Sequence, residues 1–407
     1  MNLPTLNYKR IGLIVIFVIV VCGAGYLLYS FFFKKTPPSV PVETPIENGS
    51  GNGLPSAGEG TPTQPGGTET PGLPQVPTTP GGTATPPAGV GQSQALASDA
   101  AFSFINQNGS VDFYNSSDNR FYSTSLDGKV VQLSDQQFYG VEKVIWSPAG
   151  QKAVLEYPDG SNIRYDFNRK SQVTLPKHWE DFQFSPDGEK IVAKSVGLDE
   201  NNRWLVVSND DGSRAQAVQD MGKNTEKFVS SWSPNGQSVA LFVDDIDLER
   251  TEIYFVGQNG ENYKSTIVEG RGFQPLWSPD GKDLVYSIYS SASDYKPSLW
   301  IVGAQGDAIG SNRRPLDVNT WANKCTFGGG NLYCAVPQSL DRGAGMFDMS
   351  NFPTRDSLFR IDLSSGLRQP IPLDYNYSMG NLSISADGTH LIFIDTTTGQ
   401  LRQVPLR

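Results

Sequence analysis

The residues best suited to react with each other are two cysteines in the last quarter of the chain. Cys325 and Cys334 flank the segment Phe327–Asn331, which contains three consecutive glycines. A two-residue turn at Gly329 and Gly330 would place the cysteines directly opposite each other on paired strands, with their β-carbons within reach of a disulfide. Two buried thiols or a metal site are the alternatives, although no histidine lies nearby. We predict a structural disulfide, which would suit an oxidising compartment.

Other reactive side chains are sparse. The two histidines, His178 and His390, are too far apart in sequence to form a local motif. The chain contains no G-x-S-x-G nucleophile elbow, no H-E-x-x-H motif and no cysteine–histidine cluster. The acidic run from Asp244 to Glu249 lacks the Asp/Asn–Gly spacing of a calcium loop, so a solvated loop is the simpler interpretation. The sequence predicts no cofactor, no metal site and no catalytic residue.

The most unusual candidate binding segment runs from Pro337 to Ser357. It combines methionine, aromatic and arginine side chains, which are enriched in the energetically important centres of protein interfaces. These residues are Arg342, Met346, Phe347, Met349, Phe352 and Arg355. Two interpretations stay open: the apolar groups bind a partner, or they plug the mouth of a channel and pack on a neighbouring element.

A short recurring phrase indicates which elements position these residues. It reads W/F-S-P-x-G between two apolar segments. The five copies are Trp146–Gly150, Phe184–Gly188, Trp232–Gly236, Trp277–Gly281 and the degenerate Ile384–Gly388. Proline presets φ at the second position of a turn, Asp or Asn suits the third, and glycine supplies the left-handed conformation at the fourth. Each phrase is therefore a hairpin turn, and a repeat of about 40 to 50 residues is typical of propeller blades.

The phrase W/F-S-P-D-G between two apolar strands resembles the WD40-like propeller repeat (PD40) of TolB-type proteins. The resemblance covers nearly everything from residue 100 onward. It implies an all-β fold, a β-propeller of four-stranded antiparallel blades. It implies little about activity, because that family supports many functions.

Two further units lack the phrase but keep the strand pattern. Residues 101–133 form a first blade and residues 325–373 a sixth, so the total is seven. The last unit, residues 381–405, stops one strand short. We predict that residues from about 90 to 98 supply its missing outer strand and close the ring, which removes the exposed edges of an open array. The propeller domain then spans residues 93–407.

The amino-terminal part carries a membrane signal. The segment Ile11–Phe33 holds 23 residues without a charge, enough to cross a hydrocarbon core of ~30 Å. Cleavage of this segment as a signal peptide is the alternative, although it stays apolar past its one cluster of small residues. No Lys or Arg occurs from residue 36 to residue 119, as in a translocated segment. We predict a cytoplasmic tail at 1–10, a single transmembrane helix at 11–33 in the cell membrane, and an extracytoplasmic propeller.

The segment between the helix and the propeller, residues 34–92, is rich in Pro, Gly and Thr. It cannot bury enough apolar surface to offset the entropy of ordering, so we predict a disordered linker. The net charge of the chain is −10, and the four basic and four acidic residues before residue 95 cancel. The whole excess therefore falls on the propeller and disfavours a nucleic-acid partner.

The loops between second and third strands emerge together on one face of a propeller. The sequence predicts that they lengthen at Val196–Arg203, Val243–Glu252, Tyr289–Ser298 and Pro337–Ser357. One hypothesis is a membrane-anchored, non-catalytic binding or scaffold module that takes a protein, peptide or glycan ligand on this face. The alternative is a propeller enzyme of lyase or glycosidase type, whose carboxylates come from separate blades and meet at the central channel without leaving a local motif.

Overall fold

The computed structural model describes residues 91–347 and 352–406. The predicted cytoplasmic tail, the transmembrane helix Ile11–Phe33 and the linker up to residue 90 lie outside these residues. Within the described ranges, no helix is long and apolar enough to cross a membrane.

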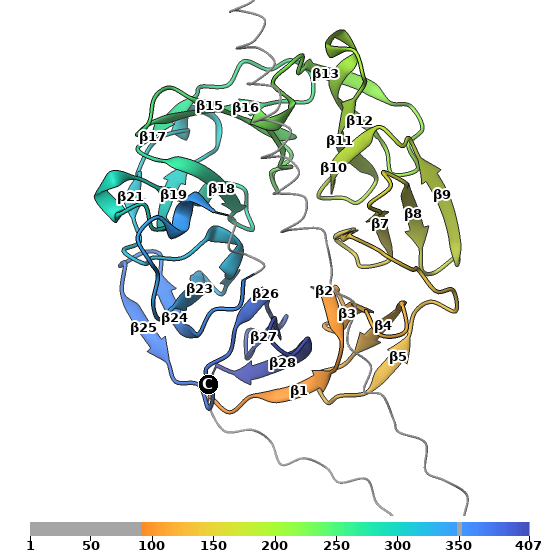
Figure 1. The fold of residues 1–407 in the computed structure, drawn as a ribbon, viewed down its shortest axis with the longest axis vertical. Helices are drawn as coiled ribbons and strands as arrows, with labels where there is room; N and C mark the ends of the chain where they lie inside the picture. The colour runs from red at the N-terminus through yellow and green to blue at the C-terminus, as the bar shows by residue number, and fades with distance from the viewer. Residues whose placement is uncertain (1–90, 348–351, 407) are drawn as a thin grey trace, which may run out of the picture. The chain divides into compact units, whose positions relative to one another are not determined.

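Seven four-stranded antiparallel sheets form a closed ring of blades, which confirms the predicted seven-bladed propeller (Figure 1). Blade 1 contains β2 (Ala100–Ile105), β3 (Val111–Asn115), β4 (Arg120–Thr124) and β5 (Val130–Gln132). Blade 2 contains β6 (Lys143–Trp146), β7 (Lys152–Glu156), β8 (Asn162–Asp166) and β9 (Ser171–Leu175). Blade 3 contains β10 (Trp179–Phe184), β11 (Lys190–Val196), β12 (Arg203–Asn209) and β13 (Gln216–Asp220).

The remaining blades follow the same order. Blade 4 contains β14 (Phe228–Ser230), β15 (Ala240–Asp245), β16 (Thr251–Val256) and β17 (Thr266–Val268). Blade 5 contains β18 (Arg271–Trp277), β19 (Asp283–Tyr289), β20 (Ser298–Gly303) and β21 (Arg314–Pro315). Blade 6 contains β22 (Cys325–Gly328), β23 (Asn331–Pro337), β24 (Asp356–Asp362) and β25 (Arg368–Ile371). Blade 7 contains β26 (Met379–Ile384), β27 (His390–Asp395), β28 (Gln400–Pro405) and β1 (Gln94–Ala97).

Short 3₁₀ turns decorate the connections. They are η1 (Glu200–Asn202), η2 (Thr225–Lys227), η3 (Ser291–Ser293), η4 (Gly306–Ala308), η5 (Ala322–Lys324) and η6 (Ala344–Met346). The first strand of each blade lies nearest the centre of the ring and the fourth lies at its rim (Figure 1). The second strands are the most buried, because they pack between the sheets of neighbouring blades. The outer strands β5 and β13 are largely exposed.

The recurring phrase forms the expected turn between first and second strands. In blade 3, the Gly188 amide donates to the Ser185 carbonyl at 2.8 Å, with Gly188 at φ +73°. The serine has a role that the sequence analysis did not assign. The Ser185 hydroxyl donates to the Asp187 carboxylate at 2.5 Å and accepts the Lys190 amide at 2.9 Å. The turn therefore closes with side-chain as well as backbone hydrogen bonds.

Tryptophans of the phrase also connect neighbouring blades. The Trp146 indole N–H donates to the Phe102 carbonyl of blade 1 at 2.6 Å. The Trp277 indole N–H donates to the Ser231 hydroxyl of blade 4 at 2.9 Å. Because each indole reaches back to the preceding blade, these bonds fix the angle between sheets as well as filling the core.

The sixth blade carries the predicted disulfide. Cys325 and Cys334 are paired residues of β22 and β23, and their sulfur atoms are bonded, with the Cα atoms 4.1 Å apart. Gly329 and Gly330 both have positive φ, +56° and +78°, as the two-residue turn requires. The disulfide thus fastens a hairpin whose turn consists of glycines.

Removing this disulfide is expected to lower the free energy of unfolding by about 2 to 3 kcal/mol, because the unfolded chain regains the freedom of a loop with a sequence separation of 9 residues. Urea unfolding of the double variant Cys325→Ala/Cys334→Ala would measure the change. The reduced wild type should unfold at the same urea concentration as the variant. Equal stability of the oxidised wild type and the variant would contradict the expectation.

Candidate functional site: the long-loop face

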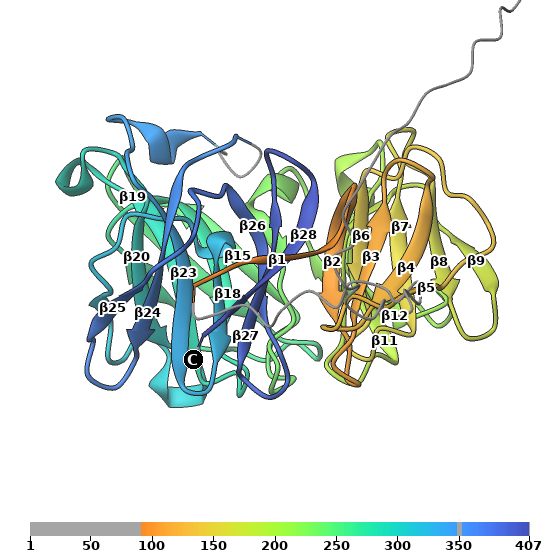
Figure 2. The same cartoon turned by 90° about the horizontal axis from the view of Figure 1, so that it is seen from below.

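The loops that join second to third strands define one face of the ring, which we call the long-loop face. Figure 2 shows the blades edge-on, with strands running between this face and the opposite one. The loops occupy residues 197–202 in blade 3, 246–250 in blade 4, 290–297 in blade 5 and 338–355 in blade 6. The predicted lengthening in blade 4 is wrong, because β15 and β16 stay paired through Asp245 and Thr251.

The blade 6 loop rests on the blade 5 loop through backbone hydrogen bonds. The Gly343 amide donates to the Asp294 carbonyl at 2.9 Å, and the Gly345 amide donates to the Tyr295 carbonyl at 2.8 Å. A β-carbon at Gly345 would lie 2.7 Å from the Tyr289 β-carbon, so only glycine allows this approach. Blade 5 in turn contacts blade 4, where the Ser291 amide donates to the Glu249 carboxylate at 3.1 Å. The loops of blades 4 to 6 therefore support each other.

The candidate binding residues of the blade 6 loop face solvent. Met346, Phe347 and Phe352 are 56%, 66% and 56% exposed, and Arg342 and Arg355 are also exposed. Met349 lies outside the described residues. The three apolar side chains are thus not packed into a neighbouring blade. Their role in binding stays a prediction.

Two neighbouring loops add apolar tips that the sequence analysis missed. Leu198 of blade 3 and Leu248 of blade 4 are among the most exposed large apolar residues of the described chain. Each is followed directly by an acidic residue in a mostly polar loop, and an isolated leucine in such a loop is the signal that could have identified it. Exposed apolar tips are therefore present on the loops of three of the four blades from 3 to 6.

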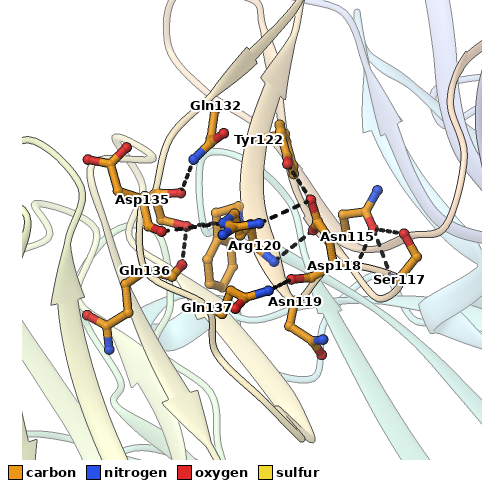
Figure 3. Close-up of polar contacts among 12 residues, drawn as sticks. Asn115, Ser117, Asp118, Asn119, Arg120, Tyr122, Gln132, Asp135, Gln136 and Gln137 are labelled. Atoms are coloured by element: carbon orange, nitrogen blue, oxygen red, sulfur yellow. Dashed lines mark hydrogen bonds and ion pairs between the residues drawn. The ribbon is translucent and has the colours of Figure 1, made fainter.

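The corresponding turn of blade 1 has a different character. The Ser117 and Asp118 amides donate to the Asn115 side-chain oxygen at 2.9 and 3.2 Å, and the Tyr122 hydroxyl donates to the Asp118 carboxylate (Figure 3). The Gln137 amide group donates to the Asp118 carbonyl at 3.0 Å. The polar groups of this turn bond to each other, to Tyr122 of β4 and to Gln137 after β5, without an exposed apolar tip. The long-loop face is therefore asymmetric around the ring.

Ion pairs lie at the long-loop ends of blades 2 to 6, mostly between the first and second strands. The pairs are Lys143 with Glu156 at 3.5 Å, Lys194 with Asp181 at 3.4 Å, Lys227 with Asp244 at 2.6 Å, Arg271 with Asp245, and Lys324 with Asp356 at 2.8 Å. Burial raises the pKa of Glu156, whereas the Asp245 carboxylate raises the pKa of Arg271. Each carboxylate of this set has a basic partner.

A cavity of about 770 Å³ opens between blades 7, 1 and 2 and the η5 turn that precedes blade 6. Its walls include the stacked pair Phe104 and Trp146, whose ring centroids are 6.2 Å apart, together with Asn381 and Lys324. The Asn381 amide group donates to the Ser103 carbonyl at 2.6 Å and closes the contact between blades 7 and 1. The cavity is of suitable size for a small ligand.

The residues considered for chemistry in the sequence lie apart. His178 precedes the first strand of blade 3, whereas His390 begins the second strand of blade 7 and bonds to Thr389 at 2.7 Å. In the acidic run, Asp247 accepts the Arg250 guanidinium at 2.8 Å, while Asp244, Asp245 and Glu249 take the partners given above. Among the described residues, no group of three or more His, Cys, Asp and Glu residues is arranged to hold a metal ion.

Comparison with known proteins supports the fold only. No protein-family model and no curated protein matches the chain. Among solved structures, the chain is similar to the β-propeller domain of Cps50 (Swd1) from Myceliophteria thermophila, with 13% identity, a TM-score of 0.53, and coverage of 77% of this chain and 100% of that one. It is also similar to oligogalacturonate lyase from Vibrio parahaemolyticus, with 11% identity, a TM-score of 0.50 and coverage of 77% and 93%.

A third similar structure, the tricorn protease, gives 11% identity and a TM-score of 0.50 over 77% of this chain. The chain spans 34% of the length of that protein. Two of these three structures are named as enzymes and one as a β-propeller domain, so the comparisons do not choose between catalysis and binding. They agree with the ring of seven sheets: the chain has the β-propeller fold.

Proposed function

We propose that this chain is a membrane-anchored propeller of the TolB type that binds a protein partner outside the cytoplasm through its long-loop face. The observation that carries the proposal is the blade 6 loop, where Met346, Phe347 and Phe352 stay exposed and where Gly343 and Gly345 are hydrogen-bonded to the blade 5 loop. Methionine and aromatic side chains on a pre-ordered support give large contact areas with little loss of conformational freedom on binding.

The composition of the face favours a protein over the other ligand classes. Arg342 and Arg355 flank the apolar side chains and suit carboxylates at the rim of a partner. The net charge of −10 disfavours nucleic acid. The enzyme hypothesis needs carboxylates free to transfer protons, and the five carboxylates named above at the long-loop ends of blades 2 to 6 are each paired with Lys or Arg. Binding is therefore the better-supported function.

The triple variant Met346→Ser/Phe347→Ser/Phe352→Ser is expected to weaken partner binding at least about 100-fold, because each central apolar side chain of an interface contributes about 2 kcal/mol or more. The full-length chain would capture its partner from membranes of the source organism. Titration of the identified partner against wild type and variant would then give the affinities.

The matched control is Val130→Ser/Val131→Ser/Leu367→Ser, which removes three other exposed apolar side chains, from the outer strand of blade 1 and the β24–β25 turn. It should bind as wild type does. Equal binding by both triple variants would exclude the blade 6 loop as the contact surface. The cavity beside Trp146 would then be the next site to examine.

A further inference from the structure

The opposite face holds a buried carboxylate in blade 1, at a position that the phrase-bearing blades fill with an apolar residue. Counting eight residues from the start of each phrase reaches a fully buried apolar side chain of the second strand. These side chains are Val154, Val192, Ala240, Val285 and Ile392. In blade 1 the corresponding residue of the second strand is Asp112. It directly follows the residue that pairs with the last residue of the first strand, as Val154 does in blade 2. A carboxylate here is not required by the blade.

Asp112 is 2% exposed and has no basic partner among the described residues. Its Oδ1 atom accepts the Asn106 amide N–H at 2.9 Å and the Ser123 hydroxyl at 2.6 Å. In the described part of the chain, Oδ2 accepts no hydrogen bond. Burial raises the pKa of Asp112 to about 6, although the two hydrogen bonds lower it in part. One oxygen of a buried carboxylate is thus left for a donor from outside the protein.

A cavity of about 440 Å³ lies against this carboxylate, between the turns of blades 1 and 2. Its lining is mostly polar and contributes side chains that both donate and accept hydrogen bonds. These are Asn106, Gln107, Asn108, Ser123, Gln151 and Asn168. Gly150 lies against Asp112, because a β-carbon built on Gly150 would lie 2.8 Å from Oδ2. Phe167 adds an aromatic surface.

We propose that this cavity binds a neutral saccharide, with one sugar hydroxyl donating to Asp112 Oδ2 and others pairing with the amide side chains. Hydroxyl groups match the lining because they donate and accept as amides do. An anionic ligand would be repelled by Asp112. A metal ion alone would leave most of the cavity unfilled and would find only one carboxylate. This site goes beyond the proposed function and lies on the face opposite the long loops.

Saturation-transfer NMR titrations on the full-length chain would test the proposal with two matched pairs of probes. The first pair is galactose and galacturonate, which differ by a carboxylate. The second is N-acetylglucosamine and glucosamine, which differ by a positive charge. We expect a neutral sugar of one pair to bind more tightly than its charged counterpart. Tighter binding of galacturonate or glucosamine, or no binding of any of the four, would overturn the proposal.

The Gly150→Ala variant places a methyl group at Oδ2 and should weaken sugar binding roughly tenfold or more, the loss expected when one hydrogen bond to a charged group is blocked. Gly236→Ala is its matched control, since Gly236 has the same turn and φ of +73°, with nothing within 4 Å of its β-carbon position. Equal affinities of the two glycine variants would refute the site.

A second variant keeps the test valid if Gly150→Ala does not fold. Asp112→Val installs the residue type found at this position in blades 2, 3 and 5, so the fold should persist while sugar binding is lost. Thermal unfolding of the same samples would check the fold. A folded Asp112→Val variant that binds the sugar as wild type does would show that the carboxylate is not part of a binding site.

Discussion

Replacing Leu96 by aspartate is expected to lower the free energy of unfolding by at least about 4 kcal/mol, because the change removes a buried leucine and places a charge in its site. Leu96 of β1 is 6% exposed and packs with Ile392, Ile394 and Leu401 of the same blade. The free energy of unfolding of the full-length Leu96→Asp variant, followed by tryptophan fluorescence in urea, would measure the loss.

Ala95→Asp is the matched control, since Ala95 is the exposed neighbour on the same strand. It introduces the same charge into the same backbone pairing with β28 and should change stability by less than about 0.5 kcal/mol. Two variants of equal stability would mean that β1 adds little to blade 7. The expected contrast would instead show that the ring depends on the strand from the start of the domain.

The strand β1 closes the ring because it joins residues from both ends of the domain. Gln94 and Ala95 pair with Gln403 and Arg402 of β28, and the Arg402 guanidinium also donates to the Ser93 hydroxyl at 2.7 Å. Without β1, the edge of β28 would present unpaired backbone groups to solvent. The closing strand was predictable from a simple observation: the last unit of the sequence has three strands where the others have four.

The blades were predictable for a similar reason, because each phrase combines a local turn with flanking apolar strands. What the sequence could not reveal depends on contacts between blades. The inner strands of blades 1, 3, 5 and 7 each contain a bulge with positive φ, at Phe102, Asp181, Gly272 and Asn381. Three of these four residues have a side chain, and positive φ is uncommon for such residues, so no local sequence signal predicts the bulges.

The candidate sites divide in the same way. The blade 6 loop stood out in the sequence because it is long and concentrates methionine, phenylalanine and arginine within one segment. Asp112 did not, because a single aspartate near an Asn–Gly turn is ordinary until its register is compared with that of the other blades. Its cavity is formed with Gly150 and Asn168 of blade 2, which lie far along the chain. Sites assembled from two blades require the fold before they can be recognised.

The buried ion pair at the base of the blade 6 loop gives the second large effect. Lys324 and Asp356 are joined at 2.8 Å, and their side chains are 9% and 0% exposed. Asp356 Oδ2 also accepts the Met379 amide at 2.7 Å, and Oδ1 accepts the Thr354 hydroxyl at 2.8 Å. Because Asp356 begins β24 and Met379 begins β26, this carboxylate connects the end of the loop to blade 7.

Lys324→Met is expected to lower the free energy of unfolding by about 3 to 5 kcal/mol, because it leaves the Asp356 carboxylate buried without a counter-charge. Urea unfolding would measure the loss. The double variant Lys324→Met/Asp356→Asn should recover part of it, since the asparagine oxygen can still accept the Met379 amide and its NH2 group can donate to the Thr354 hydroxyl oxygen, without a charge. No recovery in the double variant would show that the lysine acts through packing rather than through its charge.

The control for this prediction is Lys282→Met, which breaks an exposed pair with Asp280 at 3.3 Å. It should change the free energy of unfolding by less than about 1 kcal/mol.

The contrast also bears on function, because Thr354 and Asp356 fix the end of the loop that carries Phe352. If the loop binds its partner in a pre-ordered form, Lys324→Met should weaken binding even without urea, when the ring stays folded. Unchanged binding in a folded Lys324→Met variant would mean that the loop adapts to its partner, and that its support by blade 7 is not needed for recognition.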